Sequence, residues 1–383
     1  MKSSTTRWLL ALHRWCGVIV SINLFVLALT GIILIFHEEI DSALGVVPAA
    51  QAGENRTSLA EAIALAKQGE PGAHPVFLFA DEEEHPGVAF VGMSKTSRKL
   101  DDAKTVSVDL RRGQLLPTVD FDGSFTGVVF RLHAELLAGP IGRLLVGVVA
   151  LALVISLVSG AVVYGPMMKR FAFGLLRRDR ARRTFLADLH KLVGATTFGW
   201  LLLVTLTGLF LSLGSVALQY YSVTELAALG APYAKEPIVE ELGSVDEAIK
   251  TAESTAAGRS WSFVALPGSD LASPRHYTVL LKGGTGLQSR MLTLALVDAK
   301  QPSRGEAHEL PLYLKVLLLS EPLHFGDYGG WPLKLVWTLF GVTTLVLSAS
   351  GVWVFASGRG DRRARKRSQV IDDAEERAAL SSP

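Results

Sequence analysis

Four long apolar runs stand out in the chain, and polar segments separate them. They cover residues 15–36, 144–164, 192–216 and 333–355. Each reaches the roughly 20 apolar residues with which a helix crosses a bilayer. Lys334 is the one charged residue within them, and a lysine at the end of a span can extend to the interface. The pattern predicts four transmembrane helices. The first is too long for a signal peptide and is predicted to stay as an uncleaved anchor, with residues 46–52 as a weaker alternative cleavage site.

The two long polar segments, about 40–140 and 217–330, share one order of elements. Helical apolar spacing marks residues 58–68 and 244–255, and three short strand-like runs follow each of them. Ser58 and Ser244 are predicted to cap these helices, because Glu61 and Glu247 stand three residues later. Each segment is small for an independent domain, so we expect the two to pack on each other.

An internal repeat underlies this order. Leu-His followed by a basic residue precedes the first and third spans, which places His13 and His190 at an offset of 177. A second Leu-His precedes the second and fourth spans, which places His133 and His324 at an offset of 191, together with matching Ser-Gly pairs at 159–160 and 350–351. The predicted fold is therefore membrane α+β: four transmembrane helices built from two parallel repeats, each with an outer domain of one helix and an antiparallel sheet.

Charge adds an orientation to this picture. The chain is 49% hydrophobic with a net charge of +2, which gives no indication of nucleic-acid binding. Basic residues gather in residues 1–14, 165–185 and 359–367, so the positive-inside rule predicts that both termini are cytoplasmic and both polar segments lie outside. Cys16 is the one cysteine, which excludes an intrachain disulfide, a covalently attached c-type haem and a cysteine-rich metal site.

These patterns give the following predicted boundaries: 1–37, cytoplasmic N-terminus and first span; 38–131, first outer domain; 132–165, interfacial segment and second span; 166–185, basic cytoplasmic loop; 186–216, third span; 217–322, second outer domain; 323–356, interfacial segment and fourth span; 357–383, basic cytoplasmic tail.

Several motifs together resemble the PepSY-associated transmembrane family. They are Leu-His-Arg-Trp-x-Gly at 12–17, Leu-Thr-Gly at 29–31, Val-Asp-x-x-x-Gly at 108–113, and Leu-His at 132–133 and 323–324. The sequence is most similar to the ferric-siderophore reductases of that family, which are haem-b proteins of the bacterial inner membrane with four spans and periplasmic PepSY-like domains. The resemblance thus implies that the outer domains are periplasmic and PepSY-like, and that the cofactor is haem b.

His13 and His190 are the predicted axial ligands of a first haem, near the cytoplasmic face. An ionisable residue at the mouth of a span is costly and suggests a function, and two neutral imidazoles form a low-spin haem site. Four small residues on the same helices are predicted to leave room for the macrocycle: Gly17, Gly31, Gly194 and Gly208. The alternative is helix packing through small residues, with the histidines at the interface.

His133 and His324 are the predicted ligands of a second haem near the outer face. The Gly-Pro and Gly-Gly-Trp-Pro that follow them should break a helix. The alternative is a pair of interfacial histidines that bond to the outer domains. His37 has no repeat partner and is a third candidate at this face, either as a replacement ligand or beside the substrate.

The predicted function is an inner-membrane oxidoreductase. It would take electrons from a cytoplasmic or membrane donor and reduce a periplasmic Fe(III)-siderophore, which would release Fe(II) for uptake. Two alternatives stay open at this point. One is a di-haem electron carrier for another acceptor, such as a quinone or a periplasmic oxidant. The other is a non-enzymatic PepSY-type membrane regulator in which the histidines are structural.

Overall fold

A computed structural model describes residues 3–46, 48–82, 85–117, 120–168, 174–284 and 286–380. The chain divides into two compact units. We call Met1–Ile35, Val129–Leu209 and Gly330–Pro383 the helical unit, and Phe36–Val128 and Phe210–Gly329 the sheet unit. Lys169 and Arg170 of the predicted basic loop lie outside the described residues.

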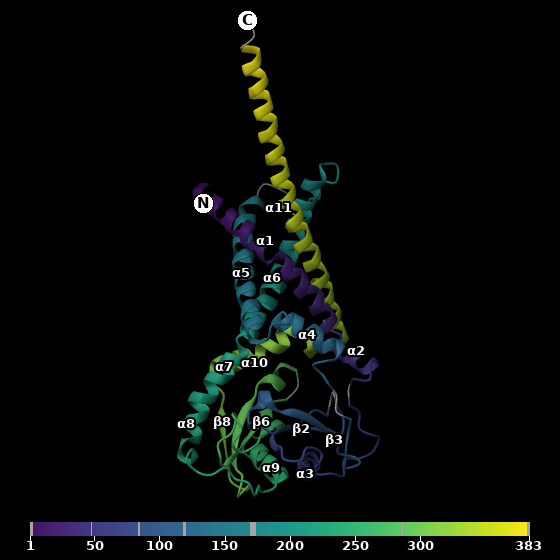
Figure 1. The fold of residues 1–383 in the computed structure, drawn as a ribbon, viewed down its shortest axis with the longest axis vertical. Helices are drawn as coiled ribbons and strands as arrows, with labels where there is room; N and C mark the ends of the chain where they lie inside the picture. Colours follow the sequence, from purple (N-terminus) through teal and green to yellow (C-terminus); the bar gives the residue numbers. More distant parts are fainter. Residues whose placement is uncertain are drawn as a thin grey trace. The chain divides into compact units, whose positions relative to one another are not determined.

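Four long helices form the helical unit, and Figure 1 shows them side by side. They are α1 (Ser3–Leu34), α5 (Gly139–Met168), α6 (Arg182–Ser212) and α11 (Gly330–Leu380). Segments long and apolar enough to cross a membrane run over Ser4–Leu34, Gly139–Gly165, Arg182–Ser212 and Asp327–Gly358. Each of the four predicted spans thus lies in a helix that is long and apolar enough to cross a membrane. The helices α1 and α6 begin about ten residues before their apolar runs, whereas α5 and α11 extend past both ends of theirs.

Inside this unit, the helices pack through apolar side chains and hide their few polar groups. Val20, Leu24, Leu153, Leu201 and Leu347 form the buried centre. Serine and threonine hydroxyls mostly donate to carbonyls of their own helix one turn back, as membrane helices require. Many of the apolar side chains that face outward are exposed, as expected where lipid is the solvent.

Glycine-containing breaks separate the spans from the short helices that carry His133 and His324. His133 lies in the last turn of α4 (Phe125–Glu135), and His324 lies in the last turn of α10 (Leu312–Phe325). Gly139 and Gly326 adopt φ values of 58° and 72°, a region open to glycine at little cost. The predicted helix breaks after both histidines are therefore confirmed.

A continuous antiparallel sheet of eight strands organises the sheet unit, in the order β4-β3-β2-β1-β5-β6-β7-β8. The strands are β1 (His74–Ala80), β2 (Val88–Ser94), β3 (Lys104–Asp109), β4 (Gln114–Leu115), β5 (Ser260–Ala265), β6 (His276–Lys282), β7 (Thr293–Asp298) and β8 (Gly305–Glu309). The two polar segments meet where β1 pairs with β5, with Leu78 opposite Val264. They therefore pack on each other by sharing one sheet.

Helices cover this sheet on both faces. One face packs against α3 (Leu59–Gly69) and α9 (Val245–Thr255) around a shared core that includes Leu78 and Val264. On the second half, the other face packs against α7 (Gly214–Tyr221) and α10, with Tyr221 and Leu314 in the core between them. The remaining short elements are α2 (His37–Ala43), η1 (Leu100–Asp102), η2 (Ser222–Leu226), α8 (Ala227–Gly230), η3 (Ala231–Tyr233), η4 (Gly286–Arg290) and η5 (Asp327–Gly329).

The predicted caps are present on both sheet-unit helices. The Ser58 hydroxyl accepts from the Glu61 backbone N–H, and the Glu61 carboxylate accepts from the Ser58 N–H at 2.8 Å, which makes a complete capping box. The Ser244 hydroxyl accepts from the Glu247 N–H at 3.3 Å. These sequence signals are local, so they predict local structure well.

The Val-Asp motif forms a turn in both halves of the sheet. The buried Asp109 carboxylate accepts three backbone N–H bonds, from Gln51, Arg111 and Arg112. Asp298 accepts two backbone N–H bonds after β7. The role of this motif is therefore structural, because it closes the strand-to-strand turns.

Candidate haem-ligand site

His13 lies on α1, and a backbone carbonyl of α5 fixes its ring. The His13 Nδ1 atom lies 2.8 Å from the Ser156 carbonyl oxygen. A carbonyl oxygen can only accept, so Nδ1 carries the proton and Nε2 carries the lone pair. The Ser156 carbonyl oxygen also accepts a hydrogen bond from the Ser159 hydroxyl, at 3.0 Å.

His190 lies on α6, and α11 holds it in the same manner. Its Nδ1 atom lies 3.1 Å from the Leu347 carbonyl oxygen and 3.1 Å from the Ser350 hydroxyl. The same argument places the proton on Nδ1 and the lone pair on Nε2. Leu347 stands at an offset of 191 from Ser156, so the partners of the two histidines match as the histidines do.

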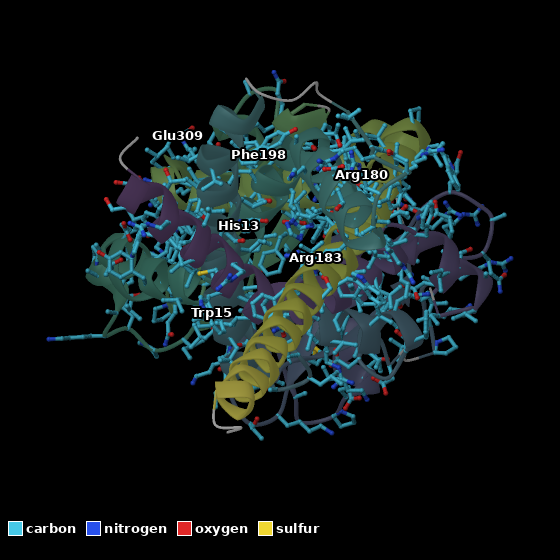
Figure 2. The ribbon with its side chains drawn as sticks, turned by 90° about the horizontal axis from the view of Figure 1, so that it is seen from above. His13, Trp15, Arg180, Arg183, Phe198 and Glu309 are labelled. Carbon is cyan, nitrogen blue, oxygen red and sulfur yellow. The ribbon has the colours of Figure 1, made fainter. Side chains whose placement is uncertain are left out.

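The two imidazole rings lie close to each other in the helical unit. Their centroids are 6.4 Å apart, with 61° between the ring planes. Figure 2 views this end of the bundle from above and labels His13. Neither Nε2 atom has a hydrogen-bond partner among the described residues. The arrangement brings two imidazole rings together, each with its Nε2 lone pair available.

Two glycines lie directly against these rings. A Cβ on Gly160 would come within 2.8 Å of His13 Cε1, and a Cβ on Gly351 would come within 3.0 Å of His190 Cε1. Both belong to the repeated Ser-Gly pairs. The repeat in the sequence marked Gly160 and Gly351 as matched positions. Their place beside the histidine rings could not be predicted from the sequence, because it depends on which helix each histidine faces.

The four glycines predicted to border the macrocycle have more varied surroundings. A Cβ on Gly17 would meet Ser156 and one on Gly194 would meet Leu347, each at 3.4 Å, which is ordinary contact between packed helices. A Cβ on Gly31 would lie 3.3 Å from His133. A role for Gly17, Gly194, Gly31 and Gly208 beside a macrocycle stays a prediction.

His133 of α4 is also held in a defined state. Its Nδ1 atom lies 2.9 Å from the Thr30 hydroxyl of α1. That hydroxyl donates to the Val26 carbonyl at 2.7 Å, so it accepts from His133, and Nδ1 again carries the proton. Three of the four repeat-matched histidines thus share one tautomer.

His324 and His37 belong to the sheet unit. His324 is half-buried in the last turn of α10, with its ring centroid 5.8 Å from that of Phe325. His37 is exposed and begins α2, after a turn that ends α1 at Leu34. Their pairing with His133 stays a prediction.

The spacing of the His13 and His190 rings is compatible with two axial ligands of one haem. Metal–imidazole bonds are about 2 Å long, so two imidazoles on opposite sides of one metal ion have centroids about 6 Å apart once the ring radii are added. The observed 6.4 Å agrees. Among the described residues, no group of three or more His, Cys, Asp or Glu side chains is arranged to hold a metal ion by itself. A bis-histidine haem needs no such group, because the porphyrin supplies the other nitrogens.

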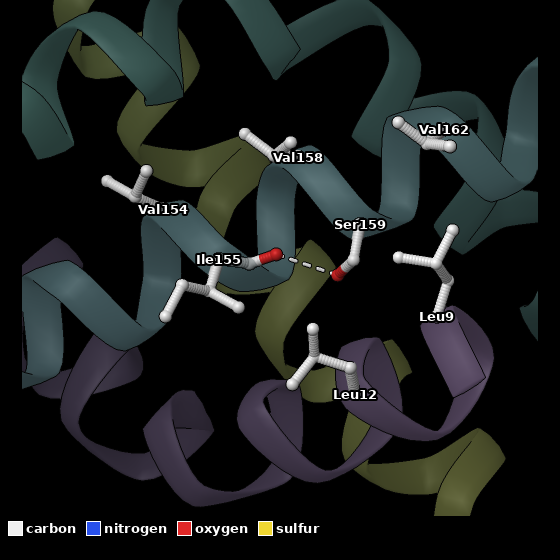
Figure 3. Close-up of a pocket in the computed structure, with 7 residues that line it drawn as sticks. All are labelled: Leu9, Leu12, Val154, Ile155, Val158, Ser159 and Val162. Atoms are coloured by element: carbon white, nitrogen blue, oxygen red, sulfur yellow. Dashed lines mark hydrogen bonds between the residues drawn. The ribbon is translucent and has the colours of Figure 1, made fainter. Parts of the chain in front are cut away.

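An apolar groove lies beside this site, between α1 and α5 (Figure 3). Its lining is Leu9, Leu12, Val154, Ile155, Val158, Ser159 and Val162. The Ser159 hydroxyl donates to the Ile155 carbonyl at 2.7 Å, so the groove offers hydrocarbon contact rather than polar recognition.

Comparison with known proteins gives two matches. The profile of the family described as the PepSY-associated TM region matches residues 10–357. An uncharacterized protein of Pseudomonas aeruginosa is 24% identical over 256 residues, which cover 61% of this chain and 63% of the relative. The chain thus aligns with less than two thirds of that relative.

Proposed function

Because this chain belongs to the family of the PepSY-associated TM region, we propose that it is a haem-b reductase of the bacterial inner membrane. Its substrate would be a periplasmic Fe(III)-siderophore. Reduction of the bound Fe(III) would release the iron from the siderophore as Fe(II) for uptake. The observation that carries the proposal is the His13–His190 pair. In both rings Nδ1 bonds a backbone carbonyl, which leaves the Nε2 lone pair available for a metal, and the ring centroids are 6.4 Å apart.

The residues of this chain would orient and protect the cofactor. Haem, when bound, supplies one-electron transfer. The carbonyls of Ser156 and Leu347 hold the two ligand rings in one tautomer, which also makes each Nε2 a stronger donor. The apolar side chains of the surrounding helices would limit the access of water to the cofactor.

A second haem near the outer face is part of the proposal. His133 has the same protonation as His13, through its bond to Thr30. His324 is its proposed partner, with His37 as the alternative. Two haems at opposite faces would carry electrons from a cytoplasmic or membrane donor to the acceptor, and the two PepSY-like parts of the sheet unit would face the periplasm.

The proposed orientation rests on charge. The basic residues of the N-terminus, the loop after α5 and the C-terminal tail are all expected at the cytoplasmic face under the positive-inside rule. This places both termini in the cytoplasm and supports an inner-membrane location.

A visible spectrum of the detergent-purified chain tests the proposal. Oxidised and dithionite-reduced spectra, with a pyridine haemochrome count, should show b-type bands and two haems per chain. His13→Ala and His133→Ala should each remove one haem, whereas His74→Ala, an exposed sheet-unit histidine, should remove none. Absence of a Soret band after expression with added haem would refute the reductase and favour the regulator.

The acceptor needs a separate assay. Proteoliposomes with the haem-loaded chain and a reductant trapped inside should reduce external Fe(III)-siderophore, which a ferrous chelator detects. Haem oxidation by a quinone but not by the siderophore would instead favour the carrier for another acceptor.

A further inference from the structure

Arg183 occupies a defined position relative to His190. The two residues are seven apart on α6, which is two helical turns, so they share one face and are about 10 Å apart along the axis. Figure 2 looks down the long axis of Figure 1 and labels both Arg183 and His13. Arg183 is therefore placed on the ligand-bearing face of α6, on the side of the predicted cytoplasm.

Two glycines of α11 confirm this geometry. A Cβ on Gly351 would come within 3.0 Å of the His190 ring, and a Cβ on Gly358 would come within 2.7 Å of the Arg183 guanidinium. Gly351 and Gly358 are also seven residues apart. The ring and the guanidinium thus rest on one face of α11, at the same two-turn spacing.

Three other described cations near this end have the following contacts. The Arg177 guanidinium and the Lys191 amine pair with the buried Asp188, at 2.8 and 3.7 Å. The Arg182 guanidinium stacks over Trp353 at 4.6 Å. Neighbouring positions on a helix point about 100° apart, so Arg182 has the charge and depth of Arg183 but another direction.

We propose that Arg183 binds a propionate carboxylate of the haem held by His13 and His190. This inference rests on the proposed function and adds an anion-binding residue to it. Haem propionates leave one edge of the macrocycle, and their carboxylates lie beyond that edge on the side where they can reach water. An arginine two helical turns from the ligand histidine, on the same helix face, is placed to bind such a carboxylate. Its planar donors match a carboxylate in a bidentate manner.

The test compares haem with its dimethyl ester, in which both propionates are neutral. The full-length chain is purified from haem-deficient cells as wild type, Arg183→Gln, Arg183→Lys and Arg182→Gln, and each ligand is titrated by absorbance. Because two haems are proposed, the titration should show two binding phases. The phase that reports on the His13–His190 site is the one that His190→Ala removes. Arg183→Gln should weaken haem binding about tenfold, as expected for loss of a charge-assisted bond, and should leave ester binding unchanged. Arg183→Lys should recover part of the loss, and Arg182→Gln should match wild type.

The reduction potential gives a second readout. Loss of a cation beside the haem disfavours the added electron, so Arg183→Gln should shift the midpoint of that haem to more negative potential. Two results would overturn the inference. One is that Arg183→Gln weakens the binding of haem and of the ester equally, which would indicate an effect on folding or on lipid phosphate. The other is that Arg183→Gln and Arg182→Gln bind haem equally well. Failure of the wild type to bind haem would overturn the proposed function itself, and the inference with it.

Discussion

Gly160→Ala should displace the His13 ring while leaving every ligand residue in place. The added methyl would lie 2.8 Å from Cε1 and 2.9 Å from Nδ1 of His13, well inside ordinary contact distance. A flexible ring can turn away, but the turn breaks the 2.8 Å bond from Nδ1 to the Ser156 carbonyl. Loss of such a partner typically costs 10- to 100-fold in metal affinity.

Global stability should change little in the same variant. Alanine is about 1 kcal/mol better than glycine in a helix, which offsets the roughly 1 kcal/mol of the lost hydrogen bond. The assay is haem per chain by pyridine haemochrome at limiting haem, beside a thermal melt of the haem-free chain. We expect a tenfold or greater loss of haem affinity with a melt within a few degrees of wild type.

Gly165→Ala is the matched control, on the same helix as Gly160. Its methyl would meet no atom within 4 Å, so haem affinity should stay near that of wild type. Wild-type haem affinity in Gly160→Ala, or an equal loss in Gly165→Ala, would refute the reasoning that the Ser156 carbonyl positions His13.

Three further predictions follow from single contacts. Thr30→Val removes the acceptor of His133 Nδ1, so it should lower occupancy of the outer haem and leave the inner one unchanged, as a haem count with and without His13→Ala would show. Asp109→Asn should destabilise the sheet unit by about 1–3 kcal/mol at pH 7, measured as a lower Tm by circular dichroism. Burial raises the pKa of Asp109, but its backbone N–H donors outweigh this and leave the pKa below its ordinary value. The stabilisation by the Asp109 carboxylate should therefore be complete above about pH 3.9 and disappear as the pH falls through the lowered pKa. The Asp109→Asn variant should lack this loss of stability at low pH. Ser58→Ala removes half of the capping box with Glu61 and should cost about 1 kcal/mol, with no effect on haem content.

The amino-acid sequence by itself determined the local elements of this protein. Apolar runs predicted four spans, because each reaches the roughly 20 apolar residues that a helix needs to cross a bilayer. Period-two and helical patterns, with Ser58 and Ser244 as caps, predicted α3 and α9 of the sheet unit and the strand runs that form β1 to β3 and β5 to β7. All of these signals come from residues within a few positions of one another, and the structure confirms them.

Helix boundaries were predicted less well, because hydropathy marks the membrane and not the end of a helix. The apolar run 192–216 is split by a turn at Leu213, after which α7 begins. In the same way, α1 ends at Leu34, so His37 is not a continuation of the first span. Both breaks use backbone geometry that apolar side chains do not reveal.

The repeat identified the matched histidines, but only the tertiary structure decided what surrounds them. The partners of His13 and His190 are backbone carbonyls, which every residue has, so no sequence pattern distinguishes Ser156 or Leu347. The importance of Gly160 likewise depends on which helix faces α1. The join of β1 to β5 is of the same kind, since it pairs residues almost two hundred positions apart. Side-chain periodicity fixes which face of an element is apolar, whereas packing between elements fixes which face it meets.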